Sequence, residues 1–152
     1  KAHLEKVLSY VQLGLEEGGT VLAGGNKVQL EGELSEGYFM EPTIIEGLAY
    51  DCRTNQEEIF GPVVTIMPFD TEEEAIEIAN DTPYGLAAYI QSGDLKRAER
   101  IANKLRVGMV HINGGGFNYG SPFGGYKQSG NGREGGDMGI EDYLETKTLH
   151  GV

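Results

Sequence analysis

The sequence predicts an α/β fold in which crossover helices connect the strands of an open sheet. Short runs of β-branched and apolar residues alternate along the chain with stretches whose apolar residues recur at helical spacing. That alternation is typical of a parallel sheet with helices between its strands. The length of 152 residues is sufficient to bury a core, and a hydrophobic fraction of 39% is typical of a folded chain.

The first half of the chain predicts one long helix and several strands. The helix has apolar residues at helical spacing and ends at Gly18 and Gly19, which break the pattern. A polar stretch with several glycines follows the first strand and predicts an exposed loop. The expected elements are a helix over 3–17, a strand over 20–23, a loop over 26–37, extended segments over 38–40 and 42–45, and a buried strand over 63–69.

The second half continues with two capped helices. Thr71 and Glu74 form a capping box that begins a helix reaching Asn80, because the hydroxyl and the carboxylate can each bind an unpaired backbone amide. Asp94 is a suitable cap for a second helix ending near Leu105. Strands are expected over 87–91 and 109–112, on either side of that helix.

The composition excludes several classes of protein. The net charge of −12 argues against a nucleic-acid partner, because phosphates would be repelled. No apolar run is long enough to span a bilayer and the charged first helix is not a signal peptide, so we expect no membrane association and a cytoplasmic location. Cys52 is the single cysteine, which excludes an internal disulfide, and with three scattered histidines it makes no metal site.

The glycine-rich stretch after Asn113 predicts a binding loop. Eleven of the 24 glycines lie between Gly114 and Gly139, and the segment SPFGGYKQSG within it is too specific in its side chains for a linker. The last residues, 142–152, alternate in a way that suits an edge strand or a tail.

The segment EEIFGP, residues 57–62, contains an acidic residue and an aromatic residue two positions apart. If residues 57–60 are extended, Glu57 and Glu58 point to opposite faces, whereas Glu58 and Phe60 share one. A carboxylate beside an aromatic ring suits a ligand that has vicinal hydroxyls next to a flat ring, such as a nucleotide. An exposed glutamate beside a core phenylalanine is the alternative structural interpretation.

Several segments together resemble the aldehyde dehydrogenase family, in the same order and at similar spacing. The resemblance runs nearly end to end. The segments are GYFMEPTII, EEIFGP, YGLAAYI, GMVHIN and SPFGGYKQSGNGRE.

The resemblance implies roles for particular residues. Glu58 would bind the ribose of the nicotinamide nucleotide, NAD or NADP, and Phe60 would pack near that ribose. Asn113 would orient the aldehyde oxygen on the oxyanion side. Phe123 would line the aldehyde tunnel, and Phe117 and Tyr119 fall where the family varies its substrate contacts. For Glu134 we expect a structural salt bridge with Arg133 or Lys127.

The family's remaining machinery is expected upstream of Lys1. Its nucleophilic cysteine, general-base glutamate and dinucleotide-binding domain have no counterpart here, and Cys52 lies where the family has no catalytic residue. The resemblance therefore implies the C-terminal third of such an enzyme, inactive alone, with residues 1–141 in the catalytic domain and 142–152 as a tail for homo-dimer or homo-tetramer assembly. A non-catalytic assembly module, and a branch that releases the acyl group to coenzyme A or phosphate, are the alternatives.

Overall fold

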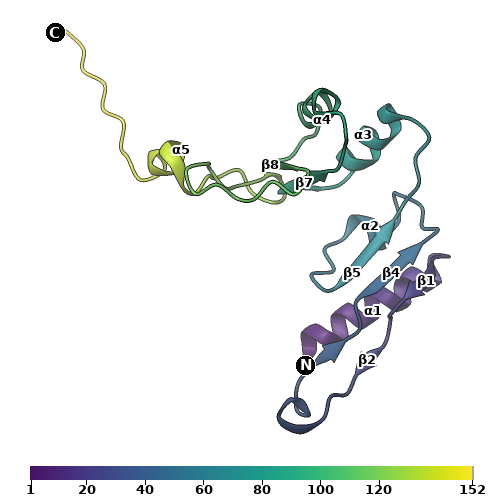
Figure 1. Cartoon of the computed structure of the whole chain (residues 1–152). Helices are drawn as coiled ribbons and strands as arrows, with labels where there is room; N and C mark the ends of the chain where they lie inside the picture. The colour runs from purple at the N-terminus through teal and green to yellow at the C-terminus, as the bar shows by residue number, and fades with distance from the viewer. Residues whose placement is uncertain (152) are drawn as a thin grey trace. The chain divides into compact units, whose positions relative to one another are not determined.

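Helices and short strands alternate along residues 1–151, which are the residues that the computed structural model describes (Figure 1). The chain divides into two units, Lys1–Ala75 and Ile76–Val152. The expected α/β class is confirmed. The boundary expected at residue 141 stays a prediction.

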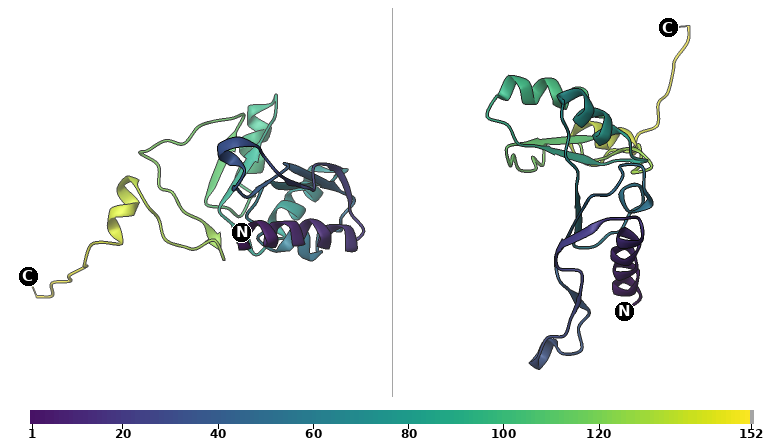
Figure 2. Two further views of the ribbon diagram at one scale, coloured as in Figure 1. Left: turned by 90° about the horizontal axis from the view of Figure 1, so that it is seen from below. Right: turned by 90° about the vertical axis from the view of Figure 1, so that its right-hand side faces the viewer.

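The first unit is built around helix α1 and a three-stranded sheet. Helix α1 (Ala2–Glu16) packs on one face of the sheet (Figures 1 and 2), whose strand order is β1-β4-β5. Strand β4 pairs antiparallel with β1 and parallel with β5. Two small elements lie in the expected loop, and one of them pairs with a strand beyond it. The bounds are β1 Thr20–Ala23, β2 Lys27–Val28, η1 Gly32–Leu34, β3 Phe39–Met40, β4 Thr43–Glu46, α2 Arg53–Gln56 and β5 Val63–Ile66.

The core of this unit lies between α1 and the sheet. Gly14 allows the close approach, since a Cβ there would lie 3.1 Å from Ile45 Cδ1. Ile45 is completely buried. Burial of this kind contributes about 25 cal/mol per Å² of apolar surface. The buried apolar side chains of the unit are Leu4, Val7, Val11, Ile45 and Leu48.

A strand is present in the first part of the expected segment 63–69, but the expectation that it is buried is wrong. Strand β5 ends at Ile66, and its burial alternates, with Val64 and Ile66 about half exposed. The reason is that, within residues 1–75, α1 covers the sheet face of Ile45 and Thr65, whereas Val64 and Ile66 point to the opposite face.

Helix α3 (Glu72–Asn80) spans the division between the units and has the expected cap. The Glu74 amide donates to Thr71 Oγ1 (3.1 Å), and the Glu74 carboxylate accepts from the Asp70 amide (2.7 Å). The first bond satisfies an amide that the helix start leaves unpaired, and the second holds the backbone just before the cap residue.

The second unit contains a parallel strand pair connected by a helix. Strands β7 (Ala87–Ile90) and β8 (Met109–Ile112) pair in parallel, as expected for a crossover connection. Between them lies α4 (Leu95–Ala102), whose Arg97 amide donates to Asp94 Oδ1, so the predicted cap is confirmed. The helix ends three residues earlier than predicted, because hydrogen bonds from Lys104 and Leu105 form turns instead.

The glycine-rich part of the second unit holds a small sheet and a helix that the sequence analysis did not predict. Strand β6 (Tyr84–Gly85) pairs antiparallel with β9 (Tyr126–Lys127), and α5 spans Gly136–Glu141. Residues 145–151 contain no helix or strand and lead away from α5 (Figure 2). The single open sheet of the prediction is present as one three-stranded and three two-stranded sheets among the described residues. None of the helices described is long and apolar enough to cross a membrane.

Candidate functional site

The EEIFGP segment lies along one face of helix α1. Residues 3, 6, 7 and 10 of the helix occur at the spacing of a single helical face, and each of them meets a different residue of the segment. The contacts pair His3 with Phe60, Lys6 with Glu58, Val7 with Gly61, and Tyr10 with Glu57.

The two glutamates of the segment have different environments. Glu57 Oε1 accepts from Arg53 Nε (2.7 Å), its Oε2 accepts from Arg53 Nη2 (3.0 Å), and Oε2 also accepts from the Tyr10 hydroxyl (2.7 Å). Arg53 and then Tyr10 lower the pKa of Glu57 from 4.5 to about 2. Glu58 is exposed, and only its backbone carbonyl is held, by Lys6. Glu57 is therefore structural, and Glu58 presents a carboxylate to solvent.

Replacing Arg53 with methionine is expected to raise the pKa of Glu57 toward 4.5, because Arg53 is the largest cause of its depression. Since the folded pKa is lowered, the stabilisation from Glu57 is present above the unfolded pKa and is lost between about pH 4.5 and 2. A titration of the Glu57 carboxyl carbon by NMR in the 152-residue chain measures this directly. Tyr10→Phe should produce a smaller rise, and an unchanged pKa in Arg53→Met would show that the ion pair does not form.

Phe60 does not have the extended conformation assumed in the sequence analysis. Its φ of +60° lies in the left-handed region, which is uncommon for a bulky residue. The residue is 73% exposed, and its ring meets the His3 ring edge-on, with centroids 6.0 Å apart. The alternative interpretation as a core phenylalanine is therefore wrong within this chain, and the reasoning that placed residues 58 and 60 on one strand face does not apply.

Gly61 is required by the close approach of α1. A Cβ at this position would lie 2.6 Å from both Cγ1 and Cγ2 of Val7, which is almost fully buried. Only glycine permits this contact without displacing the helix or the segment.

Asn113 directly follows strand β8 and binds the backbone of Ser92 through its side chain. Its Oδ1 accepts from the Ser92 amide (2.8 Å), and its Nδ2 donates to the Ser92 carbonyl (2.9 Å). Its φ of +51° also lies in the left-handed region, which asparagine tolerates. One hydrogen on Nδ2 remains for another acceptor.

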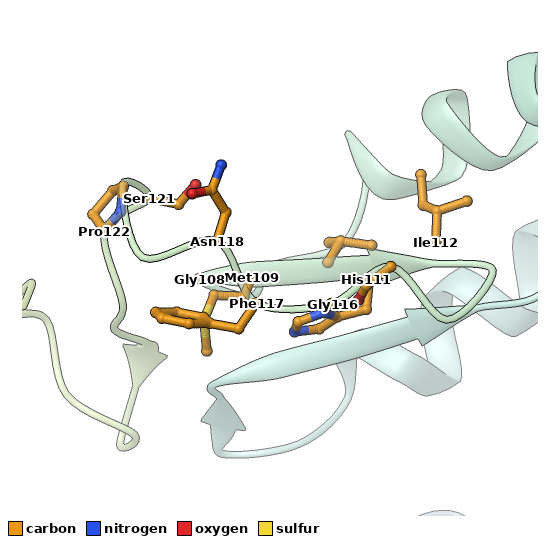
Figure 3. A pocket seen from close by; sticks show the side chains of 11 residues that line it. Gly108, Met109, His111, Ile112, Gly116, Phe117, Asn118, Ser121 and Pro122 are labelled. Carbon is orange, nitrogen blue, oxygen red and sulfur yellow. Dashed lines mark hydrogen bonds between the residues drawn. The ribbon is translucent and has the colours of Figure 1, made fainter. Parts of the chain in front are cut away.

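The three aromatic residues predicted for the substrate side lie together. The Phe117 ring contacts Tyr119 and Phe123 edge-on, with centroid distances of 5.4 Å and 6.3 Å. A pocket of about 340 Å³ lies between β8 and residues 115–122, and Figure 3 shows the rings of His111 and Phe117 on the same side of the strand. The residues lining the pocket include no Lys, Arg, Asp or Glu, and its polar side chains are those of His111, Asn118 and Ser121.

Cys52 is not activated as a nucleophile. Partial burial, followed by the nearby Glu17 carboxylate, raises the pKa of the thiol above its usual value. Glu17 itself accepts hydrogen bonds from the Arg53 and Thr54 amides and from the Thr54 hydroxyl, at 2.6–3.1 Å. A thiol with a raised pKa beside a carboxylate is a poor thiolate source.

The expected salt bridge of Glu134 with Arg133 or Lys127 is absent from the described part of the chain. Arg133 donates to the carbonyls of residues 125, 131 and 132, and Lys127 donates to those of Asn80 and Thr82. Glu134 pairs with Phe123 through backbone hydrogen bonds in both directions. Arg133 therefore stabilises backbone carbonyls within the glycine-rich loop, and Lys127 ties the loop to the backbone after helix α3.

Three residues of the α1 face were not identified as site residues from the sequence. His3, Lys6 and Tyr10 share the face of Val7, which the helical pattern had placed in the core. Their positions at i, i+3 and i+7 beside a core residue are the only signal that could have indicated a packed role.

The comparisons with known proteins agree with this architecture. The sequence model of the aldehyde dehydrogenase family matches residues 1–149. The 3-succinoylsemialdehyde-pyridine dehydrogenase of a Pseudomonas species is 48% identical over 147 residues, which cover 97% of this chain and 30% of the relative. Betaine aldehyde dehydrogenase of Bacillus subtilis is 48% identical over 149 residues, with the same coverage.

Solved structures match as well. The indole-3-acetaldehyde dehydrogenase of P. syringae, in complex with NAD+ and IAA, superposes with a TM-score of 0.89 at 44% identity, covering 97% of this chain and 29% of that one. Betaine aldehyde dehydrogenase of Staphylococcus aureus, in complex with NAD+, gives 0.90 at 46% identity and the same coverage.

The chain belongs to the aldehyde dehydrogenase family. It spans about 30% of the length of the curated relatives that it matches.

Proposed function

We propose that these residues are the C-terminal third of an NAD(P)+-dependent aldehyde dehydrogenase, which oxidises an aldehyde to a carboxylic acid through a cysteine thioester. The observation that carries the proposal is the difference between the two glutamates of EEIFGP. Glu57 is fixed by Arg53 and Tyr10, whereas Glu58 and Phe60 are exposed beside it. Both similar structures described above are complexes with NAD+.

The first unit supplies the cofactor side in this proposal. The exposed Glu58 carboxylate suits vicinal ribose hydroxyls, because it is acceptor-only and has no ion pair among residues 1–151. The exposed Phe60 ring suits the face of a sugar or ring beside it. When bound, the nicotinamide supplies the hydride acceptor. The residues of this chain bind and orient it.

The second unit supplies the aldehyde side. Phe117, Tyr119 and Phe123 form an aromatic surface next to a pocket without charged lining, which favours apolar or aromatic aldehydes. We assign Asn113 to the oxyanion side, where the remaining hydrogen of Nδ2 is the donor. Residues 142–152 are proposed for homo-dimer or homo-tetramer assembly, and the exposed Tyr143, Leu144 and Leu149 support this.

The test is reduction of NAD+ or NADP+ by the full-length protein with a panel of aldehydes, with the 152-residue chain as control. We expect the full-length protein to form NAD(P)H and acid, and the chain alone to form neither. Dependence on added coenzyme A or phosphate would assign the enzyme to the acyl-transferring branch. No turnover by either protein with any aldehyde would contradict the proposal and favour an assembly module.

A further inference from the structure

The segment that carries Glu58 and Phe60 has no strand or helix of its own. It lies between the end of α2 at Gln56 and the start of β5 at Val63. The orientation of two exposed side chains on such a segment depends on whatever fixes the backbone beneath them. Two side chains of α1 provide that fixation.

Lys6 and His3 each bind a backbone carbonyl of the segment. Lys6 Nζ donates to the Glu58 carbonyl at 2.8 Å, and His3 Nε2 lies 2.6 Å from the Phe60 carbonyl. As a donor, the His3 nitrogen can make this bond in the neutral or the protonated ring. The bonded carbonyls belong to the two residues assigned to the cofactor.

The conformation that these bonds hold is an unusual one. Phe60 has a left-handed backbone, which is unfavourable for a bulky residue and persists only where the surroundings determine it. Val7 against Gly61 and Tyr10 against Glu57 fix the two ends of the segment. His3 and Lys6 fix the residues between those ends.

We propose that His3 and Lys6 are positioning residues that set the direction of Glu58 and Phe60 toward the dinucleotide. This inference rests on the proposed function, since it requires Glu58 to bind the cofactor. It assigns to helix α1 a part in cofactor binding that acts through the backbone of another segment.

The experiment uses the full-length protein and measures the dissociation constant of NADH or NADPH by nicotinamide fluorescence, with the KM for the oxidised form and kcat. The double variant His3→Leu/Lys6→Met removes both donors and keeps side-chain bulk. Its dissociation constant is expected to rise about tenfold, the scale of one or two net hydrogen bonds. Lys1→Met is the matched control at the N-cap of the same helix, because the Lys1 side chain makes only an exposed pair with Glu5.

A conservative variant separates positioning from general stability. His3→Gln/Lys6→Arg keeps a donor at each position and is expected to restore most of the binding. In a Glu58→Gln background the double variant should add a smaller loss than in the wild type, because the residues act through one another.

Each outcome has a defined meaning. Equal losses in both backgrounds, or no loss in the double variant while Glu58→Gln is impaired, would overturn the positioning role alone. Wild-type binding and wild-type kinetics in Glu58→Gln would overturn the assignment of Glu58 to the ribose, and this inference with it, whereas the proposed aldehyde oxidation is overturned only by the absence of turnover. Circular dichroism of each variant shows whether it is folded. If His3→Leu/Lys6→Met does not fold, the test rests on His3→Gln/Lys6→Arg alone. Binding by that variant within about twofold of wild type supports the positioning role, and a loss of about tenfold overturns it.

Discussion

Replacing Glu58 with glutamine in the full-length protein is expected to weaken dinucleotide binding or slow hydride transfer by roughly tenfold or more. Hydrogen bonds to a charged group are worth about 1.5–3 kcal/mol, and glutamine loses the charge while keeping the shape. The KM for NAD(P)+ and single-turnover formation of NAD(P)H measure the two effects separately.

Glu36→Gln is the matched control for this variant, since Glu36 is an exposed glutamate of the same unit outside the EEIFGP segment. It should leave cofactor kinetics unchanged. If Glu58→Gln instead shows wild-type kinetics with both coenzymes, the assignment of Glu58 to the ribose is wrong.

Gly108→Ala should destabilise the second unit severely. A Cβ at residue 108 would lie 1.8 Å from the Gly124 carbonyl oxygen and 2.9 Å from Gly125 Cα, so backbone rather than a flexible side chain must move. Overpacking commonly costs about 1–3 kcal/mol, and a clash with backbone is expected at or above the top of that range. The midpoint of chemical unfolding, followed by far-UV circular dichroism, measures the loss.

Gly93→Ala is the matched control for Gly108→Ala. No atom lies within 4 Å of its Cβ position, and its φ is not in the left-handed region. Its effect on unfolding should stay within about 0.5–1 kcal/mol, with stabilisation the expected sign. A Gly108→Ala chain that is as stable as Gly93→Ala would show that the loop does not approach β8 so closely.

Local signals in the sequence predicted much of the fold. The cap of α4 links Asp94 to the amide of a residue three positions on, and α1 follows from apolar residues at helical spacing. In both cases the interacting groups are near neighbours in the chain, where propensity and periodicity are informative.

Contacts between distant residues account for what the sequence did not predict. Tyr10 binds Glu57 across 47 residues, and no local pattern separates the engaged glutamate from the exposed one beside it. The left-handed backbone of Phe60 arises in the same way, from packing against α1 rather than from its own preference. The burial expected for β5 was wrong because composition indicates a strand but not what covers each of its faces.

The most direct test of the central claim, that residues 57–61 form part of the dinucleotide site, is hydrogen–deuterium exchange of the full-length protein with and without NAD(P)+. We predict slower exchange of the backbone amides in the peptide containing Glu58 to Gly61 when the dinucleotide is added, and unchanged exchange over η1 at Gly32–Leu34. Protection elsewhere in the protein, with no change at Glu58 to Gly61, would contradict the account.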